Sequence, residues 1–82
     1  MRSVDFKGFS EYDRRLLFEV RLNNDVEAAT FLIRFNMSRG HRVPFVEAYA
    51  DKYDKCLVKV VFSSELTQGE VEAEITAVIS GM

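Results

Sequence analysis

The chain of 82 residues contains one cysteine, Cys56, and one histidine, His41. A transition-metal site needs several such ligands at close spacing, so these two residues predict no metal site. Cys56 belongs to a run of strand-forming apolar residues, where a cysteine acts as a small, unreactive core residue. His41 follows a glycine that ends a predicted helix, so we expect its ring in solvent. Neither residue is therefore predicted to act as a nucleophile or a base.

Three glutamates, Glu70, Glu72 and Glu74, lie close together in the sequence. Paired carboxylates can serve as a general acid and a general base. We expect these three on the exposed side of a helix whose other side packs in the core, which is the common place for such charges. No glycine-rich loop precedes a predicted helix, so no nucleotide-phosphate loop is predicted. We therefore expect no enzyme activity and no cofactor.

Alternating apolar residues predict four strands, at residues 3–9, 15–22, 42–50 and 56–62. The segment RLLFEVRL at 15–22 alternates most clearly, with one apolar face and one mixed face. Gly8 permits a bulge in the first strand. Pro44 places the third strand at the edge of a sheet, because proline cannot donate to a central ladder.

Two segments have helical spacing, and each begins with a capping box. Asn24 and Glu27 form the first. Either Ser64 or Thr67 caps the second helix, and Thr67 and Glu70 form its candidate capping box. Gly40 ends the first helix. Beside its core stripe, this helix carries a second apolar stripe, which consists of Val26, Ala29, Ile33 and Met37. So wide an apolar surface is typical of a helix that packs on a sheet and also contacts something else.

The order is therefore ββαββα, in two similar halves, 1–40 and 41–82, that form a single α+β domain, 1–82. Neither half can cover its own sheet, so both helices are expected on one face of a four-stranded antiparallel-type sheet. With strands named A to D in chain order, the arrangement A-B-D-C puts the valine-rich strands B and D at the centre. We expect B and D to run parallel. This architecture equals a circularly permuted ferredoxin-like sandwich, with the last strand moved to the N-terminus.

The bulk properties narrow the function classes. The formal net charge of −2 argues against a general nucleic-acid binder, which usually carries a basic surplus. The single cysteine excludes an internal disulfide. No segment approaches the roughly 20 apolar residues of a membrane span, and the N-terminal residues lack an apolar signal core. We expect a cytoplasmic protein without a membrane or metal partner.

With the helices on one side, the other face of the sheet should be open and partly apolar. Its apolar residues and their aromatic neighbours are predicted to be Phe9, Leu17, Phe45, Tyr49, Leu57 and Val61. Glu19 and Lys59 should neutralise each other near its centre. An apolar centre with a sparse polar rim is typical of a protein interface. We therefore expect a small, non-enzymatic binding or regulatory module that forms a homodimer or binds another protein through this face.

A nucleic-acid-binding module is the alternative. It would use the same sheet face or the basic segment 34–42, and its candidate residues are Arg21, Lys59, Arg34, Arg39 and Arg42. RNA-recognition modules stack bases on aromatic residues of their two central strands. No aromatic residue is predicted on the open face of strands B and D, so this interpretation is the weaker one.

Two similar stretches, EYDRRLLFEV at 11–20 and KYDKCLVKVV at 52–61, could be a repeated site or two turns. Aspartate favours turns, and each stretch falls between two strands of a hairpin, so turns are expected. When the tyrosines are aligned, the strand phase slips by one residue. The similarity of the two halves predicts that both turns emerge at the same end of the sheet. Tyr12 and Tyr53 would then share a contact surface there.

Overall fold

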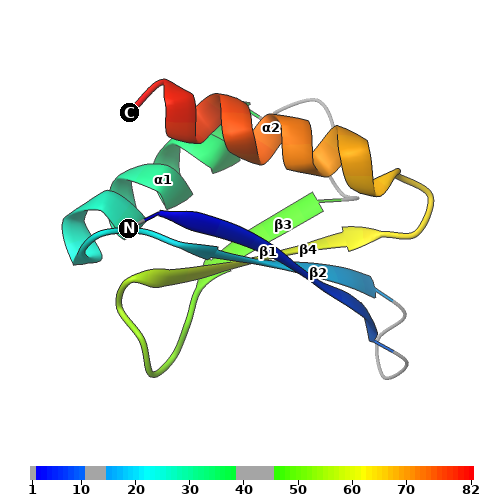
Figure 1. The fold of residues 1–82 in the computed structure, drawn as a ribbon, viewed down its shortest axis with the longest axis horizontal. Helices are drawn as coiled ribbons and strands as arrows, with labels where there is room; N and C mark the ends of the chain where they lie inside the picture. The colour runs from blue at the N-terminus through cyan, green and yellow to red at the C-terminus, as the bar shows by residue number, and fades with distance from the viewer. Residues whose placement is uncertain (1, 11–14, 39–45) are drawn as a thin grey trace.

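A computed structural model describes residues 2–10, 15–38 and 46–82. Its elements are β1 (Ser3–Ser10), β2 (Arg15–Arg21), α1 (Asp25–Ser38), β3 (Val46–Ala50), β4 (Leu57–Ser63) and α2 (Gln68–Ser80). The strands form one antiparallel sheet in the order β1-β2-β4-β3, and both helices pack on the same face of it (Figure 1). The predicted ββαββα fold and strand order are confirmed. Residues 42–45 of the third predicted strand, Pro44 included, lie outside the described residues.

The prediction that the two central strands run parallel is wrong. β2 pairs with β4 in antiparallel fashion, with Arg15 opposite Ser63 and Arg21 opposite Leu57. After β2, the chain crosses through α1 to β3, and the β3–β4 hairpin then brings β4 back between β2 and β3. β4 is therefore antiparallel to both of its neighbours.

The strand directions also correct the expected position of the two hairpin turns. Ser10 and Arg15, which flank the first turn, lie at the end of the sheet where β4 finishes. The β3–β4 turn lies at the opposite end, beyond the pair of Arg21 and Leu57 (Figure 1). The two turns are therefore at opposite ends and not at the same end, because the two halves are related by a pseudo-twofold axis perpendicular to the sheet.

The core lies between the helices and the covered face of the sheet. Its fully buried large side chains are Phe18, Val20, Phe31, Phe35, Val46, Val58, Val60, Phe62, Val71 and Ile75. The ring of Phe18 is central, with centroid distances of 5.2 Å to Phe6 and 5.7 Å to Phe62. Burying a side chain of this size stabilises the fold by about 1.5–3 kcal/mol. Residues 16, 18 and 20 of β2 and residues 58, 60 and 62 of β4 thus face the helices, while β4 is also apolar on its other face.

Both predicted helix caps are confirmed. The side-chain oxygen of Asn24 accepts a hydrogen bond from the backbone N–H of Glu27 at 2.8 Å. The carboxylate of Glu27 accepts one from the backbone N–H of Asn23 at 3.4 Å, one residue before the expected donor. Thr67 accepts from the N–H of Glu70 at 3.2 Å. The bonds to Glu27 and Glu70 satisfy amides that the first turn of a helix otherwise leaves free.

β1 contains a bulge at Gly8, where φ is 98°. The pairing with β2 shifts between Phe6 and Gly8, so that Phe9 lies opposite Leu16. Leu16 faces the helices, and Phe9 therefore shares that side of the sheet. The prediction that Phe9 lies on the open face is wrong, because the extra residue of the bulge reverses the alternation after it.

Candidate binding surfaces

The face of the sheet opposite the helices, the open face, is less apolar than predicted. Leu57 and Val61, which were expected to be exposed, are only 8% and 7% exposed, and Leu17 is half-buried. Tyr49, in contrast, is exposed on this face as expected. The open face therefore presents much less apolar surface than the residue types alone indicate.

Two ion pairs lie beside these apolar side chains, one across β4 and one at the β3–β4 turn. Arg15 on β2 and Glu47 on β3 are 2.7 Å apart, and their side chains bridge β4 on the side of Val61. Arg21 lies opposite Leu57 and contacts Asp54 at 2.6 Å. The periodicity of a single strand does not show such contacts, because each one joins residues far apart in the sequence.

Glu19 and Lys59, which were expected to neutralise each other, form their ion pairs with other residues. Glu19 and Lys59 lie opposite each other on β2 and β4. Glu19 is 3.8 Å from the ammonium group of Lys7, and Lys59 is 3.3 Å from the carboxylate of Asp51. Arg21 and Lys59, two candidates for nucleic-acid contact, are therefore each engaged by a carboxylate. This pairing removes much of the positive potential that a phosphate backbone needs.

Two aspartates hold the β3–β4 turn. Asp51 accepts hydrogen bonds from the backbone N–H groups of Tyr53 at 2.9 Å and Asp54 at 2.8 Å. Asp54 in turn accepts from the backbone N–H of Cys56 at 2.9 Å. These two N–H groups, and then Lys59, hold the pKa of Asp51 below its usual value, while Arg21 and then the amide of Cys56 lower the pKa of Asp54. The second Tyr-Asp stretch is thus a turn, as predicted; the first lies partly outside the described residues.

We expect the turn to lose stability in acid. A carboxyl group whose pKa is lower in the folded state stabilises the fold fully above its unfolded value, near 3.8 for aspartate, and this contribution disappears as the pH falls through the lowered folded value. The urea midpoint should therefore be constant above about pH 5 and fall below pH 4. Asp51→Asn should lower the midpoint at pH 7 and flatten its dependence on pH. Glu72→Gln, which changes an exposed carboxylate on α2, should keep the parent's full dependence; equal curves for both variants would contradict the assignment.

The outer face of α1 exposes the largest apolar side chains of any helix that the structure describes. Val26, Ile33 and Met37 are 70%, 61% and 76% exposed, whereas Phe31 and Phe35 on the opposite side are fully buried. They belong to the second apolar stripe that the sequence predicts on this helix. We call the surface formed by Val26, Ala29, Thr30, Ile33 and Met37 the α1 outer face.

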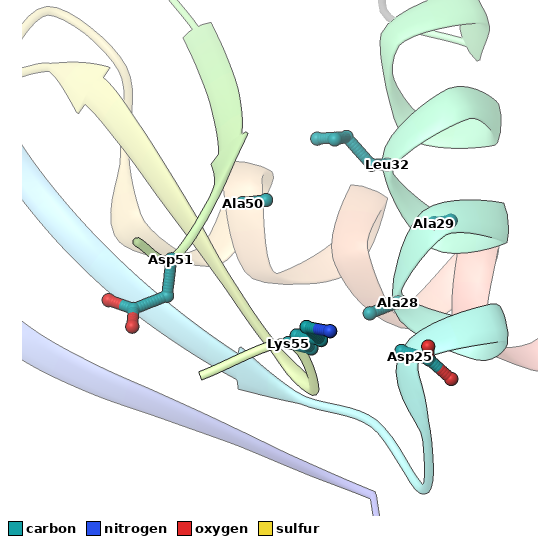
Figure 2. A pocket seen from close by; sticks show the side chains of 7 residues that line it. All are labelled: Asp25, Ala28, Ala29, Leu32, Ala50, Asp51 and Lys55. Atoms are coloured by element: carbon teal, nitrogen blue, oxygen red, sulfur yellow. The ribbon is translucent and has the colours of Figure 1, made fainter. Parts of the chain in front are cut away.

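A pocket of about 250 Å³ opens between α1 and the end of β3. Ala28, Ala29 and Leu32 line it from α1, and Ala50 lines it from β3. Figure 2 shows Leu32 and Ala50 turned toward each other across the gap, with Asp25 and Lys55 at its rim. Asp51 also borders the pocket, but its carboxylate points away from it (Figure 2). No local motif could reveal this pocket, because its walls come from three separate segments.

The other residues predicted to make contacts are scattered. Tyr53 is exposed in the β3–β4 turn. Arg34 donates a hydrogen bond to the backbone oxygen of Gly81 at 2.7 Å and so ties α1 to the end of α2. The predicted site residues Tyr12, Phe45, Arg39 and Arg42 lie outside the described residues. Among the described candidates for nucleic-acid contact, Arg34 therefore lies beside the end of α2, away from Arg21 and Lys59 on the open face.

The next features are Cys56 and the side chains that could bind a metal ion, in the described part of the chain. Cys56 is half-buried in the turn before β4, so it is not the core residue of a central strand that the sequence predicts; the strand begins one residue later. Among the described residues, no three histidine, cysteine or acidic side chains are grouped so that they could hold a metal ion. In the same part of the chain, no helix is long and apolar enough to cross a membrane.

Comparisons of the chain with protein-family models, with curated proteins and with solved structures found no match.

Proposed function

We propose that this chain is a small, non-enzymatic binding module that associates with a second copy of itself through the α1 outer face. The observation that carries the proposal is the row of exposed apolar side chains Val26, Ile33 and Met37 on one helix. A helix that is apolar on two sides is typically covered on both. The open face is the weaker candidate, because Leu57 and Val61 are buried there and ion pairs lie beside them.

The spacing of the α1 outer face suits the pairing of two helices. Val26, Thr30, Ile33 and Met37 follow one another at alternating steps of four, three and four residues, as the seam of a coiled coil does. In an antiparallel pair, Val26 of one copy lies against Met37 of the other, with Thr30 and Ile33 at the centre. Ala29 beside this seam is small enough to let the two helices approach closely. One stripe can therefore serve both copies around a twofold axis.

The charges beside the seam favour the antiparallel arrangement. The first turn of α1 carries Asp25 and Glu27, and Arg34 lies two turns further along. In an antiparallel pair, Arg34 of one copy approaches Glu27 of the other, while a parallel pair would bring like charges together. The two helix dipoles also oppose each other in the antiparallel pair. The charges of the outer part of α1 are therefore arranged for an antiparallel pair, in which Glu27 would keep its contact with Arg2 and Arg34 its bond to Gly81 of the same chain.

The test is the mass of the protein in solution. We expect the parent to sediment as a dimer over a concentration series, and Ile33→Glu to weaken the dimer by roughly 10- to 100-fold in Kd, because the substitution places a charge at the seam. The side chain of Ile33 is exposed, so circular dichroism should show an unchanged fold. The matched control is Thr76→Glu, which adds the same charge to an exposed position on α2 and should leave the dimer intact. A parent that stays monomeric at the highest concentration would refute the proposal.

A further inference from the structure

We propose that the outer edge of β3 and the pocket beside it bind an extended segment of a partner protein by β-strand addition. The expected segment carries an apolar anchor side chain preceded by acidic residues. This surface shares only Ala29 with the α1 outer face and does not depend on self-association. The proposal therefore goes beyond the proposed function, and each can fail without the other.

The backbone of β3 has hydrogen-bonding groups that point away from the sheet. The N–H of Asp51 donates to the backbone oxygen of Leu57 at 2.9 Å, so these two residues are a pair joined by one ladder bond, while the N–H of Leu57 donates to Asp54. Such pairs alternate along an antiparallel ladder, which makes Tyr49 the next residue directed at β4. The N–H and C=O groups of Ala48 and Ala50 consequently point outward. No strand that the structure describes pairs with this edge.

The two edges of the sheet differ in their protection. β1 carries a bulge at Gly8, and a bulge interrupts the regular row of outward groups that another strand would need. β3 pairs with β4 in regular register from Val46 to Ala50, without a bulge. The two residues whose backbone groups point outward, Ala48 and Ala50, are alanines. Their small side chains lie on the helix side of the sheet and leave room beside this edge. β3 is therefore the edge that can accept another strand.

The pocket lies where an added strand would place a side chain. In a strand paired with β3, the residue opposite Ala50 projects to the same side of the sheet as Ala50. That side chain would enter the space between Ala50 and the apolar wall formed by Ala28, Ala29 and Leu32. A cavity of about 250 Å³ lies below the 300–1,000 Å³ usual for small-molecule sites. Its size suits a single side chain such as leucine or methionine, so the backbone would supply affinity and the pocket selectivity.

The charge around the pocket indicates which sequence fits. In the β3–β4 turn, Asp51 is engaged by Lys59 and Asp54 by Arg21. Lys52 and Lys55 have no carboxylate partner among the described residues; Lys52 lies over the ring of Tyr53, and Lys55 lines the pocket together with Asp25. The turn end of β3 is thus net positive. An antiparallel partner strand reaches this end with the residues before its anchor, which should therefore be acidic.

A second copy of this chain fits the pocket poorly. If two β3 strands paired around a twofold axis centred on Ala48, the residue opposite Ala50 would be Val46 of the other copy. Val46 is fully buried in its own core and cannot turn into a neighbour's pocket. The occupant that fits the observations is therefore a segment of a different protein.

The experiment is a selection from a phage-displayed library of random heptapeptides on the immobilised protein. We expect enrichment of peptides in which acidic residues precede a leucine, isoleucine or methionine. A labelled synthetic copy of the most enriched peptide should then bind roughly tenfold or more weakly to two variants. Ala48→Pro removes an outward N–H without breaking a bond to β4, and Ala29→Leu fills the pocket from an exposed helix position.

Two controls keep the outcome clear. Ala73→Leu makes the same change at an exposed position on α2 and should bind the peptide like the parent, and so should Ile33→Glu. Proline can strain a strand, so Ala48→Pro could fail to fold. In that case the peptide affinity of Ala29→Leu alone tests the proposal. The proposal is overturned if no peptide is enriched, if Ala29→Leu binds as the parent does, or if Ala48→Pro folds and instead lowers the sedimentation mass. The last result would assign the edge to a second copy.

Discussion

Phe18→Ala is expected to lower the free energy of unfolding by about 3–5 kcal/mol, the usual cost of removing a buried phenylalanine. The side chain is fully buried on the central strand β2, and its ring contacts those of Phe6 and Phe62 on the two adjacent strands. A chain of this size has a total stability of only about 4–12 kcal/mol. The loss is therefore a large fraction of the total stability, and the variant should unfold at a much lower urea concentration than the parent. Urea titration followed by circular dichroism measures the loss.

Phe9→Ala is the matched control. Phe9 lies on the same side of the sheet but at its outer edge, where it is 50% exposed. Its truncation should cost about 1 kcal/mol, in proportion to the smaller apolar area that it buries. Both titrations should be made at one protein concentration, because self-association adds to the apparent stability. Equal losses for the two variants would contradict the central position assigned to Phe18.

Replacing two glycines by alanine should change stability in opposite directions. At Gly8, φ is 98°, a region that costs an L-residue about 1–2 kcal/mol, so Gly8→Ala should destabilise the protein by that amount. A methyl group at Gly8 would meet no atom within 4 Å, so this cost comes from the backbone and not from a clash. Gly69 lies in the first turn of α2, also with free space around it, and its φ is not in the positive region. Gly69→Ala should stabilise the protein by about 0.4–1 kcal/mol.

The pair of variants is informative because the chemical change is identical. Thermal unfolding should show Gly8→Ala melting below the parent and Gly69→Ala melting above it, by several degrees each. If Gly8→Ala melts with the parent, then the bulge of β1 does not hold residue 8 at positive φ. The register that places Phe9 opposite Leu16 would then need revision as well.

Much of the fold could be predicted because local patterns carry it. Leu16, Phe18 and Val20 alternate without interruption, and that alternation alone places them toward the helices. Asn24 and Thr67 mark the two helix starts through a side-chain oxygen that caps free amides. Such signals come from residues that are close together in the sequence, so a single sequence is enough to recognise them.

The predictions that were wrong concern residues whose surroundings come from distant parts of the sequence. Gly8 indicated that a bulge was possible in β1, but the sequence does not show whether the strand forms one. The bulge decides on which side of the sheet Phe9 lies. The surroundings of Val61 include the ion pair of Arg15 and Glu47, which come from two other strands. The pocket beneath Leu32 exists only because the β3–β4 turn comes close to α1. None of these features has a local pattern.

The antiparallel pairing of β2 with β4 has a consequence for how the chain folds. Each hairpin joins strands that are close in the sequence, and such contacts form early because short loops cost little entropy to close. The pairing of β2 with β4 joins the two halves of the chain and must be slower. Until it forms, each hairpin exposes one edge of a valine- and phenylalanine-rich strand, which is a template for pairing with other molecules. The two strands at the centre of the finished sheet, β2 and β4, are thus the ones most prone to aggregation before the chain has folded.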